Sequence, residues 1–323
     1  MFAVVEITAW HWAGFVAFIL VFLALDLGVF HRHAREVRFK EAGFWTVLLT
    51  ALALAFAGAL FLWRGADDAL EYLTGYIIEL SLSMDNVFVI ALIFAFFRVP
   101  AEYQHRVLFW GILGALLMRG IMIGAGAALV SQAHWVLYIF GGFLIYTGIR
   151  MAFSKDEGVH PESNPVIKAA RKLYPVTLNY EGQKFLVRQN GRRMLTPLAL
   201  VLLMVETTDL IFALDSIPAI FAVTQKPFII FTSNVFAILG LRSLYFILAG
   251  AIRYFRYLKA GLSIVLAFIG IKMLCEMWHW KIPTHIALII VLLILLGSMV
   301  LSALAASREK DEPAPPGKDE VEI

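Results

Sequence analysis

Two short stretches decide the fold: ELSLSMDN at residues 79–86 and DLIFALDS at residues 209–216. Each places two acids six positions apart, follows the second acid with a polar residue, and lies within apolar sequence. Ionisable residues inside a membrane are costly and mark functional sites. Two copies of the same pattern, far apart in the chain, predict an internal repeat built around acidic helices.

The composition agrees with a membrane setting. The chain has 323 residues, of which 61% are hydrophobic and only 16% charged, and its mean hydropathy is +0.80. A soluble domain cannot bury that much apolar surface, so the bilayer is the expected solvent. The single cysteine, Cys275, excludes an internal disulfide and a cysteine-based zinc cluster. The net charge of +3 gives no reason to expect nucleic acid as a partner.

A membrane-spanning helix needs about 20 mostly apolar residues, and the chain offers about nine such spans, which predicts an all-α polytopic membrane protein. Their expected limits are 9–30, 43–63, 70–97, 106–130, 134–153, 196–223, 229–250, 258–279 and 284–305. Lys and Arg gather in every second connection, namely 31–42, 98–106, 154–195 and 253–259. Because such residues stay on the cytoplasmic side, we expect the N-terminus outside and the C-terminus in the cytoplasm.

The repeat extends beyond the acids. GILG at 111–114 matches AILG at 237–240, and GIRM at 148–151 matches GIKM at 270–273. Each unit then contains three spans, so the second unit enters the membrane from the opposite side. Inverted repeats of this kind are typical of secondary transporters, whose substrate sites lie at the repeat interface near the midplane.

The sequence divides into six predicted parts. They are two N-terminal spans (1–69), the first three-helix repeat (70–153), a cytoplasmic loop (154–195), the second repeat (196–282), a last span (283–307) and a disordered tail (308–323). Within the loop, an amphipathic stretch predicts a short helix at 166–174. Asn190-Gly191, which favours positive φ, predicts a β-hairpin between the flanking residues 185–188 and 192–195.

The first helices of the two repeats carry five acids. They are Glu79, Asp85, Glu206, Asp209 and Asp215, and Asp26 in the first span is a sixth. Ionised and unpaired at the bilayer centre, five acids cost roughly 12 to 17 kcal/mol. Two arginines are placed well inside the membrane, Arg119 and Arg242, as candidate counter-ions or gating groups. Two positive charges do not neutralise five acids, so protons or a bound divalent cation must supply the rest.

Neutral oxygen donors lie beside the acids, and carboxylate, hydroxyl and amide oxygens suit Mg²⁺, Ca²⁺ or Mn²⁺. The additional candidate ligands are Ser83, Asn86, Thr208, Ser216 and the carbonyl of Leu214. Helical spacing puts Glu79, Ser83 and Asn86 on one stripe. A matching stripe in the second repeat consists of Glu206, Asp209 and Ser216.

The second acid of each pair has a different direction. Asp85 and Asp215 point about 120° away from Glu79 and Asp209 in an ideal helix, so all of them join one cage only if the helices are distorted. Pro218 predicts such a distortion, because it has no N–H for the carbonyl of Leu214. A purely structural polar network is the alternative reading of the acids. For Asp26, a lone acid satisfied by a neighbouring helix stands beside a gating or proton-relay role.

The acidic segments, together with FTSNVFAILGLR at 231–242, resemble the TerC family of integral membrane proteins, in particular its Alx-like members. The resemblance extends from about the first span to the last. It implies that the five acids are the family's intramembrane acids. It also implies Mn²⁺ as the transported substrate, since Alx-like bacterial members look like manganese exporters of the inner membrane. Composition and spacing alone reach only a hard divalent cation.

Three functions compete on this basis. The first is export of Mn²⁺ by alternating access in the inner membrane, with protons as candidate counter-ions, no other cofactor and an open oligomeric state. No P-loop motif suggests an ATP-driven mechanism. The second is an intramembrane aspartyl hydrolase using Asp85 and Asp215, although neither lies in a Gly-x-Gly-Asp context. The third is a membrane partner protein that aids metal loading or the insertion of exported proteins. We expect a transporter and no enzymatic activity.

Overall fold

The structure is a computed structural model that describes residues 6–25, 39–154, 161–162, 164–189, 191–248, 257–278 and 280–311. Its α-helices are α1 (Ala9–Leu25), α2 (Phe39–Arg64), α3 (Ala66–Phe96), α4 (Ala101–Gln132), α5 (Val136–Phe153), α6 (Pro165–Leu173), α7 (Pro197–Phe221), α8 (Pro227–Leu248), α9 (Leu258–Cys275) and α10 (Thr284–Asp311). A short 3₁₀ helix, η3 (Glu276–Trp278), follows α9. The protein is a polytopic all-α membrane protein, as predicted.

Eight helices in the described part of the chain are long and apolar enough to cross a membrane, and α1 is a shorter apolar helix. Together they match the nine predicted spans in order and approximate position. Helices α2, α3, α4, α8 and α10 begin before the predicted limits or end after them, because polar residues at the ends of a span still join the helix. In α3, for example, Asp67 and Asp68 form part of the first turn, where negative side chains interact favourably with the helix dipole.

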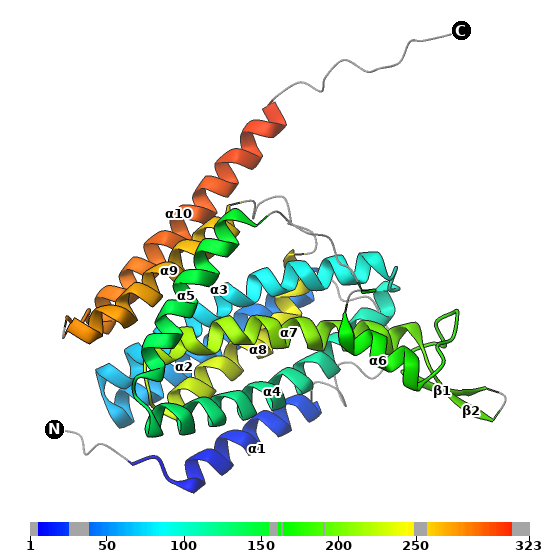
Figure 1. The fold of residues 1–323 in the computed structure, drawn as a ribbon, viewed down its shortest axis with the longest axis horizontal. Helices are drawn as coiled ribbons and strands as arrows, with labels where there is room; N and C mark the ends of the chain where they lie inside the picture. Colours follow the sequence, from blue (N-terminus) through cyan, green and yellow to red (C-terminus); the bar gives the residue numbers. More distant parts are fainter. Residues whose placement is uncertain are drawn as a thin grey trace.

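The connection between α5 and α7 contains the predicted small elements. Asn164 caps α6 by accepting hydrogen bonds from the backbone N–H groups of Val166 and Ile167. Strands β1 (Leu186–Gln189) and β2 (Arg192–Leu195) pair antiparallel, and Gly191 has a φ of 76° in the turn between them. Asn190 lies outside the described residues. Figure 1 shows α6 and the hairpin beyond one end of the helix bundle.

The two predicted repeats contact each other symmetrically, with α3, α4 and α5 corresponding to α7, α8 and α9. Helix α3 packs on α8 as α4 packs on α7, and α5 packs along α9. Where α5 crosses α9, a Cβ atom on Gly148 would lie 2.7 Å from the carbonyl oxygen of Ser263, and one on Gly270 would lie 2.6 Å from that of Gly141. The sequence match of 148–151 with 270–273 pairs Gly148 with Gly270 and Gly141 with Ser263. The two close approaches are therefore the same contact made twice.

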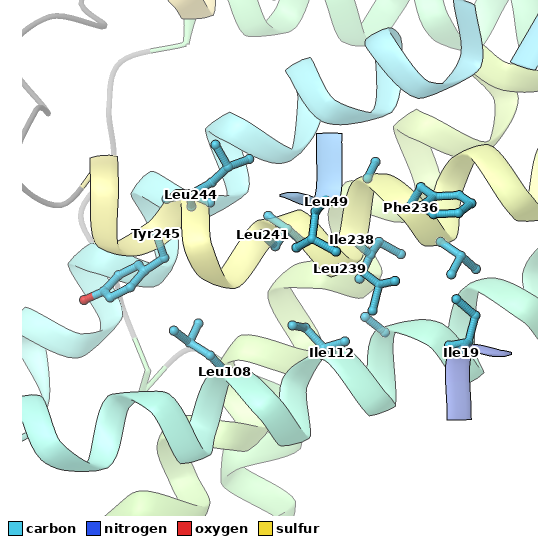
Figure 2. Packing of buried hydrophobic residues seen from close by; sticks show 14 of the residues in the cluster. Ile19, Leu49, Leu108, Ile112, Phe236, Ile238, Leu239, Leu241, Leu244 and Tyr245 are labelled. Carbon is cyan, nitrogen blue, oxygen red and sulfur yellow. The ribbon is translucent and has the colours of Figure 1, made fainter. Parts of the chain in front are cut away.

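Helix α8 is the most buried span in the described part of the chain. Its apolar side chains fill the space between α2, α3 and α4, and Figure 2 shows Leu108 and Ile112 of α4 pointing toward α8. Its polar residues Thr232, Ser233 and Asn234 have no exposed surface at all. The core therefore surrounds a polar segment rather than excluding it.

The described parts of three basic connections lie at one end of the bundle, and residues 31–38 of the first lie outside the described part of the chain. The Tyr180 hydroxyl donates a 2.7 Å hydrogen bond to the carbonyl of Phe97, and Lys259 Nζ donates a 3.0 Å bond to the carbonyl of Ser154. These contacts join the connection after α3, the connection after α5 and the start of α9. This is the alternation that the positive charges predict; which side of the cell this end faces stays a prediction, as do the domain limits.

Two local expectations need correction or restriction. Helix α10 continues to Asp311, beyond the predicted start of the disordered tail at residue 308, because the charged residues after Ser307 extend the helix; the rest of the tail lies outside the described residues. Helix α7 runs through Pro218 to Phe221, so Pro218 does not end the helix. A proline near the end of a helix removes one hydrogen bond, and the packing of α7 tolerates that loss.

Candidate functional site

The predicted stripe on α3 lies in the interior of the bundle. Glu79, Ser83 and Asn86 are 1%, 2% and 1% exposed, as their spacing of four and three residues requires if one of them faces the core. The Ser83 hydroxyl lies 3.5 Å from Glu79 Oε1. The α3 stripe thus presents a carboxylate, a hydroxyl and an amide to the same space.

The matching stripe on α7 is buried at two of its three members. Asp209 and Ser216 are 4% and 1% exposed, whereas Glu206 is only half-buried. Glu206 faces α4, because a Cβ atom added to Gly114 would fall within 2.0 Å of its carboxylate oxygen. The absence of a side chain at Gly114 makes room for this carboxyl group.

A single arginine from α4 joins the two stripes. Arg119 is 2% exposed, and its Nη1 forms an ion pair with Glu79 Oε1. Its Nη2 and Nε lie 3.1 and 3.4 Å from the two oxygens of Asp209, which is the forked geometry that guanidinium groups make with carboxylates. Nη1 also lies 3.2 Å from Ser216 Oγ. Arg119 is therefore a counter-ion shared by both repeats, as one of its predicted roles requires.

Two asparagines complete the network. Asn86 Nδ2 donates a 2.8 Å hydrogen bond to Asp209 Oδ1, so a residue of α3 supports the acid of α7. Asn234 Nδ2 on α8 donates a 2.9 Å bond to Glu79 Oε2, and its Oδ1 lies 3.3 Å from Arg119 Nη1. Sequence reasoning did not single out Asn234. The signal that could have found it is the polar triplet Thr232-Ser233-Asn234 inside an apolar span.

One polar atom of this network lacks a partner. Asn86 Oδ1 is buried and has no hydrogen-bond partner among the described residues. It borders a small cavity of about 20 Å³ that Asp209 and Arg242 also line, a volume that fits about one water molecule. Arg242 Nη1 lies 3.2 Å from His105 Nε2. Arg242 is thus beside the network rather than between the two central carboxylates.

The remaining predicted site residues differ in burial and in their partners. Asp85 and Asp215 are half-buried, and Asp215 interacts electrostatically with Arg150 of α5. Thr208 Oγ1 donates to the carbonyl of Met204 in its own helix, and the side chain of Leu214 is 50% exposed. Asp26 lies outside the described residues. The described residues contain no group of three or more His, Cys, Asp or Glu side chains that could hold a metal ion.

A second charged cluster, which the sequence did not predict, lies at the opposite end of the bundle from α6. Lys226 Nζ, in the connection between α7 and α8, lies 2.5 Å from Asp68 Oδ1 and 3.0 Å from Glu71 Oε2. Thr224 donates a 2.6 Å hydrogen bond to Glu71. We call Asp68, Glu71, Thr224 and Lys226 the end cluster. It ties the start of the first repeat to the second repeat.

The central group of Glu79, Asp209, Arg119, Asn86 and Asn234, here called the central network, carries two carboxylates and one guanidinium. When both acids are ionised its net charge is −1, in a place where water is largely excluded. Hydrogen bonds to each carboxylate stabilise the ionised forms. The network can therefore hold one cation, exchange it for another, or take up a proton.

Comparisons with known proteins agree with the sequence patterns. A family model described as "Integral membrane protein TerC family" matches residues 64–311. An uncharacterised membrane protein of Myxococcus xanthus is 52% identical over 297 residues, which cover 92% of each chain. A protein of Escherichia coli K12 named "Putative membrane-bound redox modulator Alx" is 45% identical over 303 residues, 90% of this chain and 94% of the relative. No solved structure matches.

Proposed function

Because the chain belongs to the TerC family of integral membrane proteins, we propose that it is a secondary transporter that exports a divalent metal cation, with Mn²⁺ as the first candidate. Transport would proceed by alternating access of the two repeats in the inner membrane. The observation that carries the proposal is the central network: one acid from each repeat, both bound to Arg119 inside the bundle.

The chemistry of this pair favours a cation as substrate. Glu79 and Asp209 supply hard oxygen atoms, and Asn86 Oδ1 adds a buried acceptor without a partner in the described part of the chain. Such donors suit Mn²⁺, Mg²⁺ or Ca²⁺. A guanidinium binds carboxylates in the same place that a metal would occupy, so Arg119 competes with the metal for both acids. In the proposed cycle Arg119 withdraws when the metal enters and returns when it leaves.

Protons are the proposed counter-ions. Asp85, Glu206 and Asp215 are half-buried acids of α3 and α7, the helices that carry Glu79 and Asp209, and a carboxylate that loses a neighbouring metal gains affinity for protons. We propose that they accept protons when the metal leaves and release them when it binds. The proposed additional oxygen ligands are Ser83, Asn86, Thr208, Ser216 and the carbonyl of Leu214. The proposed orientation has the N-terminus outside and the basic connections in the cytoplasm, since the positive charges gather there.

The name of the Alx relatives suggests a redox role. This chain has a single cysteine, Cys275, so it cannot form an internal disulfide. We propose that any redox effect of this protein is indirect and follows from the metal content of the cell.

Flux measurements on the full chain in proteoliposomes test the proposal. The wild type should move Mn²⁺, with Mg²⁺, Ca²⁺ and Zn²⁺ as comparison ions. Glu79→Gln and Asp209→Asn should each lower Mn²⁺ flux by about 10- to 100-fold, because each removes a charged oxygen ligand. Asp67→Asn is the matched control, since Asp67 is an exposed acid of the same helix as Glu79. Unchanged flux in both site variants would refute the proposed site, and absence of flux for every ion in the wild type would refute transport.

A further inference from the structure

A large apolar groove lies between α1 and α2, and neither Glu79 nor Asp209 lines it. Its volume is about 490 Å³, within the range of about 300 to 1,000 Å³ that small-molecule sites occupy. Its floor is α8, through Phe228 and Phe236, and its walls include Phe15 of α1 and Phe56 of α2. The rings of Phe15 and Phe56 each contact both floor residues. The groove is a slot with aromatic walls.

The groove is as deep as one leaflet of a bilayer. Its lining on α1 runs from Trp10 to Phe18 and on α2 from Arg64 back to Leu52. At 1.5 Å per residue these lengths are about 12 and 18 Å. One leaflet of the hydrocarbon core is about 15 Å deep, half of about 30 Å. The antiparallel helices place Trp10 beside Trp63 and Arg64 at the same end, which is the end of the molecule that carries the end cluster.

The polar side chains of the lining are hydrogen-bond donors, and they gather at that end. Trp10 and Trp63 carry indole N–H groups and Arg64 a guanidinium, of which Nε donates to Asp68. His11 Nδ1 lies 3.1 Å from the backbone N of Thr8. Because a backbone N–H only donates, Nδ1 must accept, and the proton of the neutral ring is on Nε2. We call this end of the groove, at Trp10, His11 and Trp63, its mouth. The mouth offers hydrogen-bond donors to a ligand that is rich in hydrogen-bond acceptors.

From these features we propose that the groove binds one glycerophospholipid, with an acyl chain between α1 and α2 and the phosphate at Trp10, His11 and Trp63. Tryptophans at the membrane interface lie at headgroup level, which is the depth of a lipid phosphate. A phosphate group only accepts hydrogen bonds at neutral pH, as the mouth requires. The floor helix α8 also carries Asn234 of the central network, so an occupied groove supports the helix that positions Glu79.

A larger side chain at Gly14 would fill part of the groove without a clash with the protein. It lines the groove, and a Cβ atom added there meets nothing within 4 Å. Gly14→Leu should block the acyl chain. Gly58→Leu is the matched control, because Gly58 is an exposed helical glycine of α2 that also has open space around it and does not line the groove. Trp63→Phe tests the mouth, since it removes an N–H group and keeps an aromatic ring.

The experiment is native mass spectrometry of the full chain in detergent, titrated with dioleoyl phosphatidylglycerol or, as a probe without phosphate, dioleoylglycerol. The wild type and Gly58→Leu should bind one phospholipid more tightly than further copies, and Gly14→Leu should weaken that binding about tenfold or more. Trp63→Phe should weaken phosphatidylglycerol but not dioleoylglycerol. Equal binding by Gly14→Leu and the wild type would overturn the site. Equal affinity of the wild type for the two probes, or retention of an isoprenoid quinone in place of phospholipid, would overturn the assigned ligand.

Discussion

The central network and the end cluster each bind one basic side chain to two carboxylates, in different surroundings, and in the end cluster Arg64 Nε is a further partner of Asp68, at 2.7 Å. Arg119 is 2% exposed and its acids come from both repeats. The Lys226 side chain is 44% exposed and its two acids, Asp68 and Glu71, both lie on α3. The central network uses a forked guanidinium in a dry interior, and the end cluster uses a flexible ammonium near water.

This difference predicts different responses to the loss of the basic residue. In the interior, removal of one partner leaves carboxylates without compensation, and breaking such a buried pair costs about 3 to 5 kcal/mol. In the end cluster the Lys226 side chain is 44% exposed and Asp68 keeps its ion pair with Arg64, and exposed pairs contribute about 0 to 1 kcal/mol. The same three charges should therefore matter for stability and function in one place and for little more than local geometry in the other.

The largest effect is expected for Arg119→Met. Glu79 and Asp209 would then be buried without their counter-ion, and the free energy of unfolding should fall by about 3 to 5 kcal/mol. Unfolding in mixed micelles, followed by circular dichroism, measures this change. Adding Glu79→Gln and Asp209→Asn to Arg119→Met removes the stranded charges and should restore most of the stability. If Arg119→Met alone were as stable as the wild type, the ion pairs of the central network would be contradicted.

An intermediate effect is expected for Asn234→Leu. The substitution keeps the number of non-hydrogen atoms in the side chain and removes its hydrogen bonds to Glu79 and Arg119, and a bond to a charged group contributes about 1.5 to 3 kcal/mol. Thr232→Val is the matched control on the same buried helix, because the Thr232 hydroxyl bonds only to carbonyls of its own helix in the described structure. Similar losses for both variants in the unfolding assay would show that general packing, and not the bond to Glu79, accounts for the effect.

The smallest effect is expected for Lys226→Met, at most about 1 kcal/mol and weaker in high salt. Burial alone lowers the pKa of Lys226, but its hydrogen bonds to Asp68 and Glu71 raise it above the ordinary value of 10.5. A raised pKa means that the contribution is complete below pH 10.5 and is lost only as the pH rises through the folded-state value. The difference between wild type and Lys226→Met should thus stay constant from pH 6 to about 9. A change in that range would contradict the pairing.

Much of the fold was readable in the sequence because the bilayer imposes simple rules. Apolar length set the spans, and alternating positive charge grouped the connections. The spacing of Glu79, Ser83 and Asn86 correctly placed them on one buried face of α3. Asn190-Gly191 indicated a hairpin, and β1 and β2 form it. These features depend on residues that are close together in the sequence, so local sequence patterns are enough to predict them.

The site was harder to predict because its contacts are long-range. Asn234 bonds to Glu79 across 155 positions, and no local pattern encodes that pairing. A cage of all five acids required a distorted α7, but the helix continues through Pro218, and the described residues contain no group of three or more acids that could hold a metal ion. That the acids bind metal in another conformation of this protein stays a prediction.

The close crossing of α5 and α9 restricts which residues the two helices can carry. Gly148 against Ser263 and Gly270 against Gly141 form an isologous interface, the kind that two identical subunits make about a two-fold axis. Such a pair is what two antiparallel copies of the predicted three-helix repeat would make. The backbones of α5 and α9 approach each other closely there. A larger side chain at either glycine is therefore tolerated only if the facing helix moves away, so the sequences of the two helices constrain each other.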